Sequence, residues 1–172
     1  MVKYRNQGKM EENAMSIVLL LIAAAIAALD QWTKYLTVGS IALHEVRPVW
    51  DGVFHLTQIH NNGAAFSSFA GAQWLFALIF VVLTVAILWE LRHQRLGFCK
   101  FEWLMIAGIY GGGLGNMIDR TRLGYVVDMI AVEFMEFPVF NVADCFITVC
   151  GILLVAHLAF CNKEFWKDGK KQ

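Results

Sequence analysis

Residues 16 to 36 have the sequence SIVLLLIAAAIAALDQWTKYL, in which no charge precedes Asp30. About 20 apolar residues in a helix cross the hydrocarbon core of a bilayer. The stretch therefore predicts a transmembrane helix that carries Asp30 and Lys34 at one end. Three further stretches, at about residues 69 to 89, 101 to 118 and 139 to 160, have or approach the same length and apolar character. We therefore predict an all-α membrane protein with four transmembrane helices.

The composition agrees with this class and excludes others. Of the 172 residues, 58% are hydrophobic and 16% are charged, whereas soluble domains average about 45–50% and about 25%. The abundance of Phe, Trp and Ile excludes a disordered chain. Lys+Arg and Asp+Glu both number 14, so net charge gives no argument for nucleic-acid binding. The length favours one integral membrane domain over residues 1 to 172.

The distribution of Lys and Arg predicts the orientation. Ten of them lie in the head, in the connection between the second and third spans, and in the tail. The other four are Lys34, Arg47, Arg120 and Arg122. Because basic residues gather on the cytoplasmic side, we expect both termini there. A cleavable signal peptide ending near Ala27 or Ala28 is an alternative, but cleavage would move one basic flank outside.

The connections differ in character. The segment GVFHLTQIH, from Gly52 to His60, alternates and is rich in β-forming residues, which predicts a short sheet. The connection from Asp119 to Pro138 mixes polar and aromatic residues.

Neither cysteine nor histidine spacing predicts a metal site. The four cysteines lack a CxxC or Cys/His pattern, so we expect free thiols buried as small apolar side chains. Zinc binding by the irregularly spaced His44, His55 and His60 is a weaker interpretation than three exposed or strand-face side chains.

Polar and ionisable residues gather at one end of three predicted spans, where each is costly unless it has a partner or a role. Helical spacing allows Asp30–Lys34, Asn116–Arg120 and Asn141–Asp144 to share faces. Purely structural ion pairs, Asp30–Lys34 and Asp119–Arg120, are an equal alternative. The residues are Asp30, Lys34, Asn116, Asp119, Arg120, Asn141 and Asp144, with Asp128 in the adjoining connection.

Two aspartates brought together by folding have a specific chemical use. Close carboxylates in a poorly solvated place share one proton. One then acts as base toward water and the other as acid toward the scissile amide, with no metal or cofactor. Asp128 and Asp144 lie on different segments, so only the fold brings them together.

Five motifs follow one another along the chain: DQWTK (30–34), NNGAAFS (61–67), GGGLGNMIDR (111–120), GYVVD (124–128) and FNVAD (140–144). Together, over about residues 30 to 151, they resemble bacterial lipoprotein signal peptidase, or signal peptidase II. Departures are Gly113, where the family commonly has Ala, Cys145, where it has Ser, and Cys150, where it has Gly. The glycine run also permits close helix packing.

The resemblance implies an intramembrane aspartic endopeptidase of the bacterial cytoplasmic membrane. It implies removal of the signal peptide from diacylglyceryl-modified prolipoproteins, just before the lipidated cysteine. A small β platform and the active site then face the extracytoplasmic side, beside membrane lipid, and globomycin-type inhibitors bind. The resemblance makes Asp128 and Asp144 catalytic. Its supporting residues are Asp30, Lys34, Asn61, Gly63, Gly112, Asn116, Asp119, Arg120, Asn141 and Ala143, with no metal or cofactor.

Other classes fit less well. A transporter relaying protons through Asp30, Asp119 or Asp144 would place them near the bilayer midplane rather than at one edge. A Ser/Lys peptidase would use Lys34 with Ser67 or Ser68, but the resemblance assigns that serine segment to another motif. A purely structural scaffold rarely buries so many ionisable groups on one side.

Overall fold

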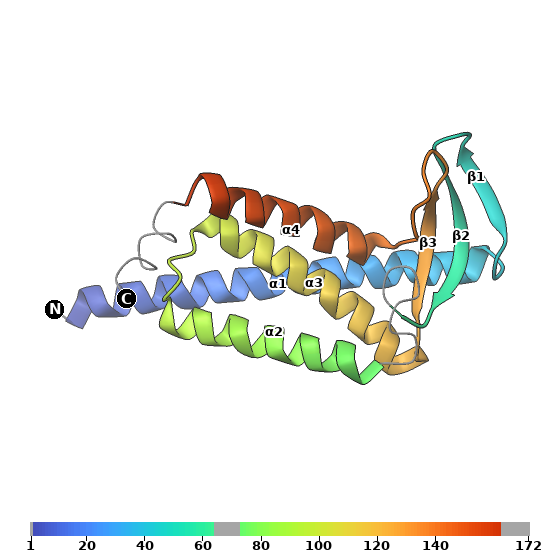
Figure 1. Cartoon of the computed structure of the whole chain (residues 1–172). Helices are drawn as coiled ribbons and strands as arrows, with labels where there is room; N and C mark the ends of the chain where they lie inside the picture. Colours follow the sequence, from blue (N-terminus) through green and yellow to red (C-terminus); the bar gives the residue numbers. More distant parts are fainter. Residues whose placement is uncertain (1, 64–72, 163–172) are drawn as a thin grey trace.

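The computed structural model describes residues 2 to 63 and 73 to 162, with side chains from residue 14 onward. Its helices lie lengthwise beside one another, and a small sheet crosses one end of them (Figure 1). The elements are α1 (Val2–Ser40), β1 (Val46–Trp50), β2 (Phe54–Asn61), α2 (Gln73–His93), α3 (Lys100–Leu123), β3 (Val126–Val132) and α4 (Val142–Phe160).

Three described helices are long and apolar enough to cross a bilayer: Ala14–Ser40 of α1, Gln73–His93 and Val142–Phe160. They expose large apolar side chains, for example Leu20, Val82 and Ile152, as helices facing lipid do. Three of the four predicted spans therefore correspond to apolar helices, with shifted ends. Residues 69 to 72 of the second predicted span lie outside the described residues. The last span begins at Val142 rather than at residue 139, because Asn141 caps α4.

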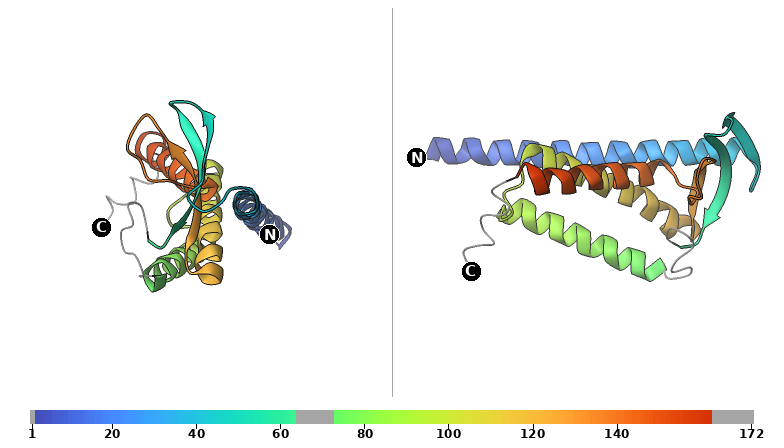
Figure 2. Two further views of the ribbon diagram at one scale, coloured as in Figure 1. Left: turned by 90° about the vertical axis from the view of Figure 1, so that its right-hand side faces the viewer. Right: turned by 45° about the horizontal axis from the view of Figure 1, so that its top comes forward.

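Helix α3 covers the third predicted span but is not among the described helices that are apolar enough to cross a bilayer. It packs against α1, α2 and α4, as the two views of Figure 2 show. Its buried residues include several glycines together with the polar Asn116 and Asp119. A helix surrounded by other helices needs little lipid-facing apolar surface, which explains its lower hydropathy.

Glycines of α3 bring the helix backbones close together. A methyl group on Gly112 would lie 2.5 Å from the Ala143 carbonyl oxygen of α4. A methyl group on Gly111 would lie 2.7 Å from the Ala23 carbonyl oxygen of α1. The close packing predicted for the glycine run is confirmed, since small residues let membrane helices approach.

Gly112→Ala is therefore expected to destabilise the protein by about 1–3 kcal/mol, because backbone of α4 occupies the space of the added methyl. Gly151→Ala in α4 is the matched control, because no atom lies within 4 Å of a methyl there. The control should be neutral or slightly stabilising, since Ala favours helix. Thermal unfolding in detergent measures both changes, and equal shifts in Tm would contradict the packing argument.

The sheet has the order β1-β2-β3 with antiparallel neighbours. The predicted β segment is confirmed as β2, whereas β3 lies in the connection from Asp119 to Pro138, for which the sequence pattern makes no strand prediction. Strand β3 (VVDMIAV) is buried along most of its length, so it lacks the polar–apolar alternation that marks a half-exposed strand. Its pairing with β2 sets Asp128 opposite Ile59.

The cysteines and outer-loop histidines agree only partly with expectation. All four thiols are free, but Cys99 and Cys161 are exposed and only Cys150 is fully buried. His55 contacts Glu133, with 2.8 Å between Nδ1 and Oε1, and the ring of His60 stacks on that of Tyr125.

Candidate active site

Asp128 projects from β3 and is 2% exposed. Its carboxylate accepts hydrogen bonds from Asn61 Nδ2 at 2.8 Å and from Asn141 Nδ2 at 2.6 Å. Burial raises the pKa of Asp128 to about 6, because the charged form is poorly solvated. The Asn61 hydrogen bond opposes this shift in pKa, and the nearby Asp144 charge adds to it. The site therefore holds a carboxyl group that can carry a proton near neutral pH.

Asp144 lies in the first turn of α4, half-buried, and is fixed by the cap of that helix. Its backbone N–H donates to Asn141 Oδ1 at 3.0 Å, and its Oδ2 accepts from the Asn141 N–H at 3.1 Å. This reciprocal pair is a capping box. The other carboxylate oxygen accepts from Asn116 Nδ2 at 2.8 Å. The prediction that Asn141 and Asp144 face the same interior is confirmed.

Asn141 connects the two carboxylates. Its side-chain amide donates to Asp128, and its backbone N–H donates to Asp144. The same amide lies 3.1 Å from Asn116 Oδ1. The fold therefore brings Asp128 and Asp144, from separate segments, to opposite sides of one fully buried asparagine.

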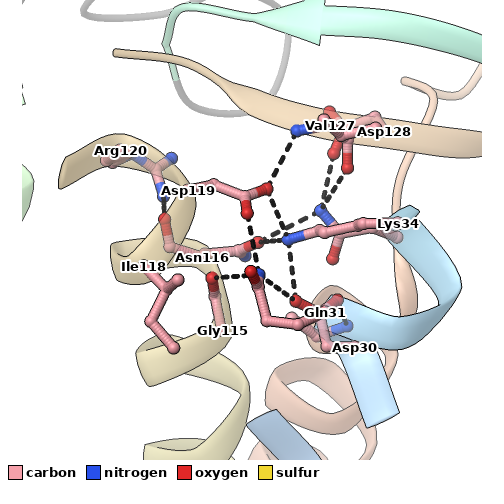
Figure 3. Close-up of polar contacts among 12 residues, drawn as sticks. Asp30, Gln31, Lys34, Gly115, Asn116, Ile118, Asp119, Arg120, Val127 and Asp128 are labelled. Atoms are coloured by element: carbon pink, nitrogen blue, oxygen red, sulfur yellow. Dashed lines mark hydrogen bonds and ion pairs between the residues drawn. The ribbon is translucent and has the colours of Figure 1, made fainter. Parts of the chain in front are cut away.

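A buried ion network centred on Lys34 lies near Asp128 (Figure 3). The Lys34 ammonium lies 2.8 Å from Asp30 Oδ2, 3.0 Å from Asp119 Oδ2 and 2.9 Å from Asn116 Oδ1. The predicted Asp30–Lys34 pair is confirmed. No Asp119–Arg120 pair occurs among the described residues. Asp119 is instead held by Lys34, because α1 and α3 pack side by side.

Two further contacts join this network to β3 and α4, which carry Asp128 and Asp144. Asp30 Oδ1 accepts from the Ala143 N–H of α4 at 2.9 Å. Asp119 Oδ2 accepts from the Val127 N–H of β3 at 3.1 Å. The residues adjoining Asp144 and Asp128 are therefore anchored to the same buried charges.

Gln31 is a network residue that the motifs did not single out. Its side-chain amide donates to Asp119 Oδ1 at 2.7 Å and to the Gly115 carbonyl at 3.1 Å. The only sequence signal for this role is that Gln31 follows Asp30 in the DQWTK motif.

Arg120 lies at the edge of the site. Its guanidinium donates to the Gly63 carbonyl at 3.2 Å and lies 4.3 Å from the centroid of the Phe76 ring. Its buried Nε has no hydrogen-bond partner among the described residues. Arg120 therefore keeps a donor that is not used within the described part of the chain.

A cavity of about 450 Å³ opens over both aspartates. Its polar lining comes from β2 and the segment just after it, and from α3, β3 and α4. Its apolar lining comes largely from the segment that precedes α4. The polar residues are Asn61, Gly63, Asn116, Arg120, Asp128 and Asp144, and the apolar ones include Phe137, Val139, Phe140 and Val149. Such a cavity suits a substrate with an apolar portion and a polar reacting group.

The Ser/Lys alternative finds no support in the position of Lys34. Its three ammonium protons face three acceptors, Asp30, Asp119 and Asn116. Ser67 and Ser68 lie outside the described residues.

A family described as signal peptidase (SPase) II matches residues 22–160 of the chain. The chain belongs to the signal peptidase II family. It is therefore a peptidase, and its apolar helices make it a membrane protein. The family resemblance drawn from the five motifs is confirmed.

Relatives of this signal peptidase II chain share most of its length. A lipoprotein signal peptidase of Streptococcus pyogenes serotype M2 is 46% identical, over 90% of this chain and 92% of the relative. One of Enterococcus faecalis is 39% identical, over 90% and 94%. A solved bacterial membrane enzyme superposes with a TM-score of 0.75 at 28% identity, covering 90% of this chain and 93% of the other.

Proposed function

We propose that this chain is an intramembrane aspartic endopeptidase that removes the signal peptide from diacylglyceryl-modified prolipoproteins, cutting just before the lipidated cysteine. Asp128 and Asp144 are its catalytic pair. The single observation that carries this assignment is that Asn141 binds both carboxylates beside one cavity.

The pair works as one acid–base unit. One carboxylate accepts a proton from water as the water attacks the scissile carbonyl, and the other donates a proton to the leaving amine. This chemistry needs no metal or cofactor.

The supporting residues divide by what they contact. Asn61, Asn116 and Asn141 orient the carboxylates, and Arg120 with Gly63 offers polar groups to the substrate backbone at the cavity edge. The residues of the buried ion network and of the α3–α4 contact fix α1, α3 and α4 to one another. They are Asp30, Lys34, Asp119, Gly112 and Ala143.

The proposed topology is one domain over residues 1 to 172 with four spans, α3 included, and both termini in the cytoplasm. The concentration of Lys and Arg in the head, the α2–α3 connection and the tail supports it. The sheet then lies with the cavity on the extracytoplasmic face of the bacterial cytoplasmic membrane. On that face the site contacts membrane lipid and binds diacylated precursors and globomycin-type inhibitors.

The proposal is tested by comparing a diacylglyceryl-modified precursor with the same precursor left unmodified. We expect the unmodified form to be cut at least about 100-fold less efficiently, because the acyl chains supply binding energy that positions the scissile bond. Cleavage by the purified protein in detergent, followed by mass spectrometry, measures this ratio. Equal rates would contradict the proposed specificity. Reconstituted vesicles should show no ion flux, which separates the peptidase from a transporter.

The pH profile gives a second prediction. Because one member of the pair must be protonated, kcat/KM should fall as pH rises through the pKa of Asp128, about 6. Asn61→Ala removes a hydrogen bond to the charged form of Asp128 and therefore raises that pKa. The falling limb should move to higher pH. The control is Asn62→Ala, at the exposed neighbouring residue. If the falling limb of the pH profile moved to lower pH in Asn61→Ala, the assignment would be contradicted.

A further inference from the structure

Three potential metal ligands converge at the end of the helices opposite the aspartate pair. Cys99 caps the start of α3, Glu102 lies in the first turn of α3, and His157 lies in the last turn of α4. One ligand atom from each lies within 4.8 Å of the others. Asp144 and His157 are 13 residues apart on α4, or about 20 Å along the axis. This Cys99–Glu102–His157 cluster is therefore separate from the cavity.

Glu102 is the most unusual member of the cluster, because its side chain is completely buried. Its carboxylate accepts hydrogen bonds from the Cys99 N–H at 2.7 Å and from Asn162 Nδ2 at 2.8 Å. It also contacts His157 Nδ1 at 3.0 Å. No Lys or Arg of the described ranges pairs with it. A buried carboxylate is costly without a cation.

The three ligand types match a borderline divalent cation. Thiolate, imidazole and carboxylate all bind Zn²⁺. One thiolate and one carboxylate also balance a charge of +2, which leaves the site neutral beside the membrane. Ligand atoms around tetrahedral zinc lie about 3.3–3.8 Å apart. The ligand atoms of the cluster lie within 4.8 Å of one another, so they must move closer by up to about 1.5 Å to reach that spacing.

We propose that Cys99, Glu102 and His157 bind one zinc-like divalent cation, with water as the fourth ligand. The cation lies between His157 Nδ1 and Glu102 Oε1, the neutral imidazole then carries its proton at Nε2, and the Cys99 thiol releases its proton to the solvent. Phe101 packs against the His157 ring, with 4.9 Å between centroids, and limits its rotation. The bound ion joins the start of α3 to the end of α4, so its role is structural.

The test uses the full chain without a polyhistidine tag, in detergent, stripped with EDTA and titrated with CoCl₂. We expect saturation at one equivalent and a thiolate-to-cobalt charge-transfer band in the near ultraviolet, with zinc displacing the cobalt. Cys99→Ser should abolish the band and weaken binding by at least about tenfold. Cys161→Ser is the matched control, since this exposed thiol lies outside the cluster, and it should leave both unchanged.

Two further measurements distinguish metal binding at this cluster from nonspecific metal binding. His157→Ala should weaken cobalt binding as Cys99→Ser does, and zinc should raise Tm in the unmodified chain but not in Cys99→Ser. If Glu102→Gln fails to fold, the Cys99→Ser variant still tests the proposal, because Cys99 is exposed. The proposal is overturned if binding does not saturate, or if the band survives in Cys99→Ser. Loss of the site would leave the peptidase assignment standing, because the aspartate pair does not contact it.

Discussion

Replacement of either Asp128 or Asp144 by Asn should reduce cleavage of a lipidated precursor by at least about 1,000-fold, because each substitution removes the shared acid–base function. Both changes keep the size of the side chain. The Asp128→Asn and Asp144→Asn variants should therefore insert in the membrane and fold as the unmodified chain does. Single-turnover cleavage of a diacylated precursor measures the rate, and the thermal unfolding midpoint checks the fold.

The control for these two variants is Asp51→Asn, in the exposed turn between β1 and β2. It makes the same chemical change outside the cavity and should retain full activity. If either Asp128→Asn or Asp144→Asn kept more than about a tenth of the rate, the pair would not perform the acid–base chemistry.

Local spacing explains which parts of the site the sequence could predict. Asp30 and Lys34 are one helical turn apart, and Asn141 and Asp144 lie in one capping turn, so these pairs form within single helices. Local spacing could not predict the partner of Asp119. Lys34 lies 85 residues earlier in the chain and reaches Asp119 only because α1 packs on α3.

Burial on more than one side weakens the sequence signal of two elements, the strand β3, which was not predicted, and the helix α3, which was. Strand β3 lacks alternation because residues on both of its faces are buried. Helix α3 has the length of a span but not the hydropathy, because other helices cover much of it. In the Cys99–Glu102–His157 cluster, His157 lies 55 residues after Glu102, a separation that no local spacing rule detects.

The largest loss of stability should come from Lys34→Met. Lys34 is 3% exposed and is the cation for both Asp30 and Asp119. Removing it leaves two buried carboxylates without a counter-ion, which costs about 3–5 kcal/mol. Arg47→Met is the matched control, because Arg47 pairs with Glu45 in solvent, where its side chain is 50% exposed. Loss of such a surface pair costs about 0–1 kcal/mol.

A second substitution shows whether charge, rather than packing, causes the loss. In Lys34→Met combined with Asp119→Asn, one of the two uncompensated charges is gone, so the double variant should be more stable than Lys34→Met alone. Thermal unfolding in the same detergent compares all the variants. Equal losses for Lys34→Met and Arg47→Met would show that the buried network is no more stabilising than a surface ion pair. A double variant less stable than Lys34→Met would show that Asp119 contributes through its bonds to Gln31 and Val127 more than its charge costs.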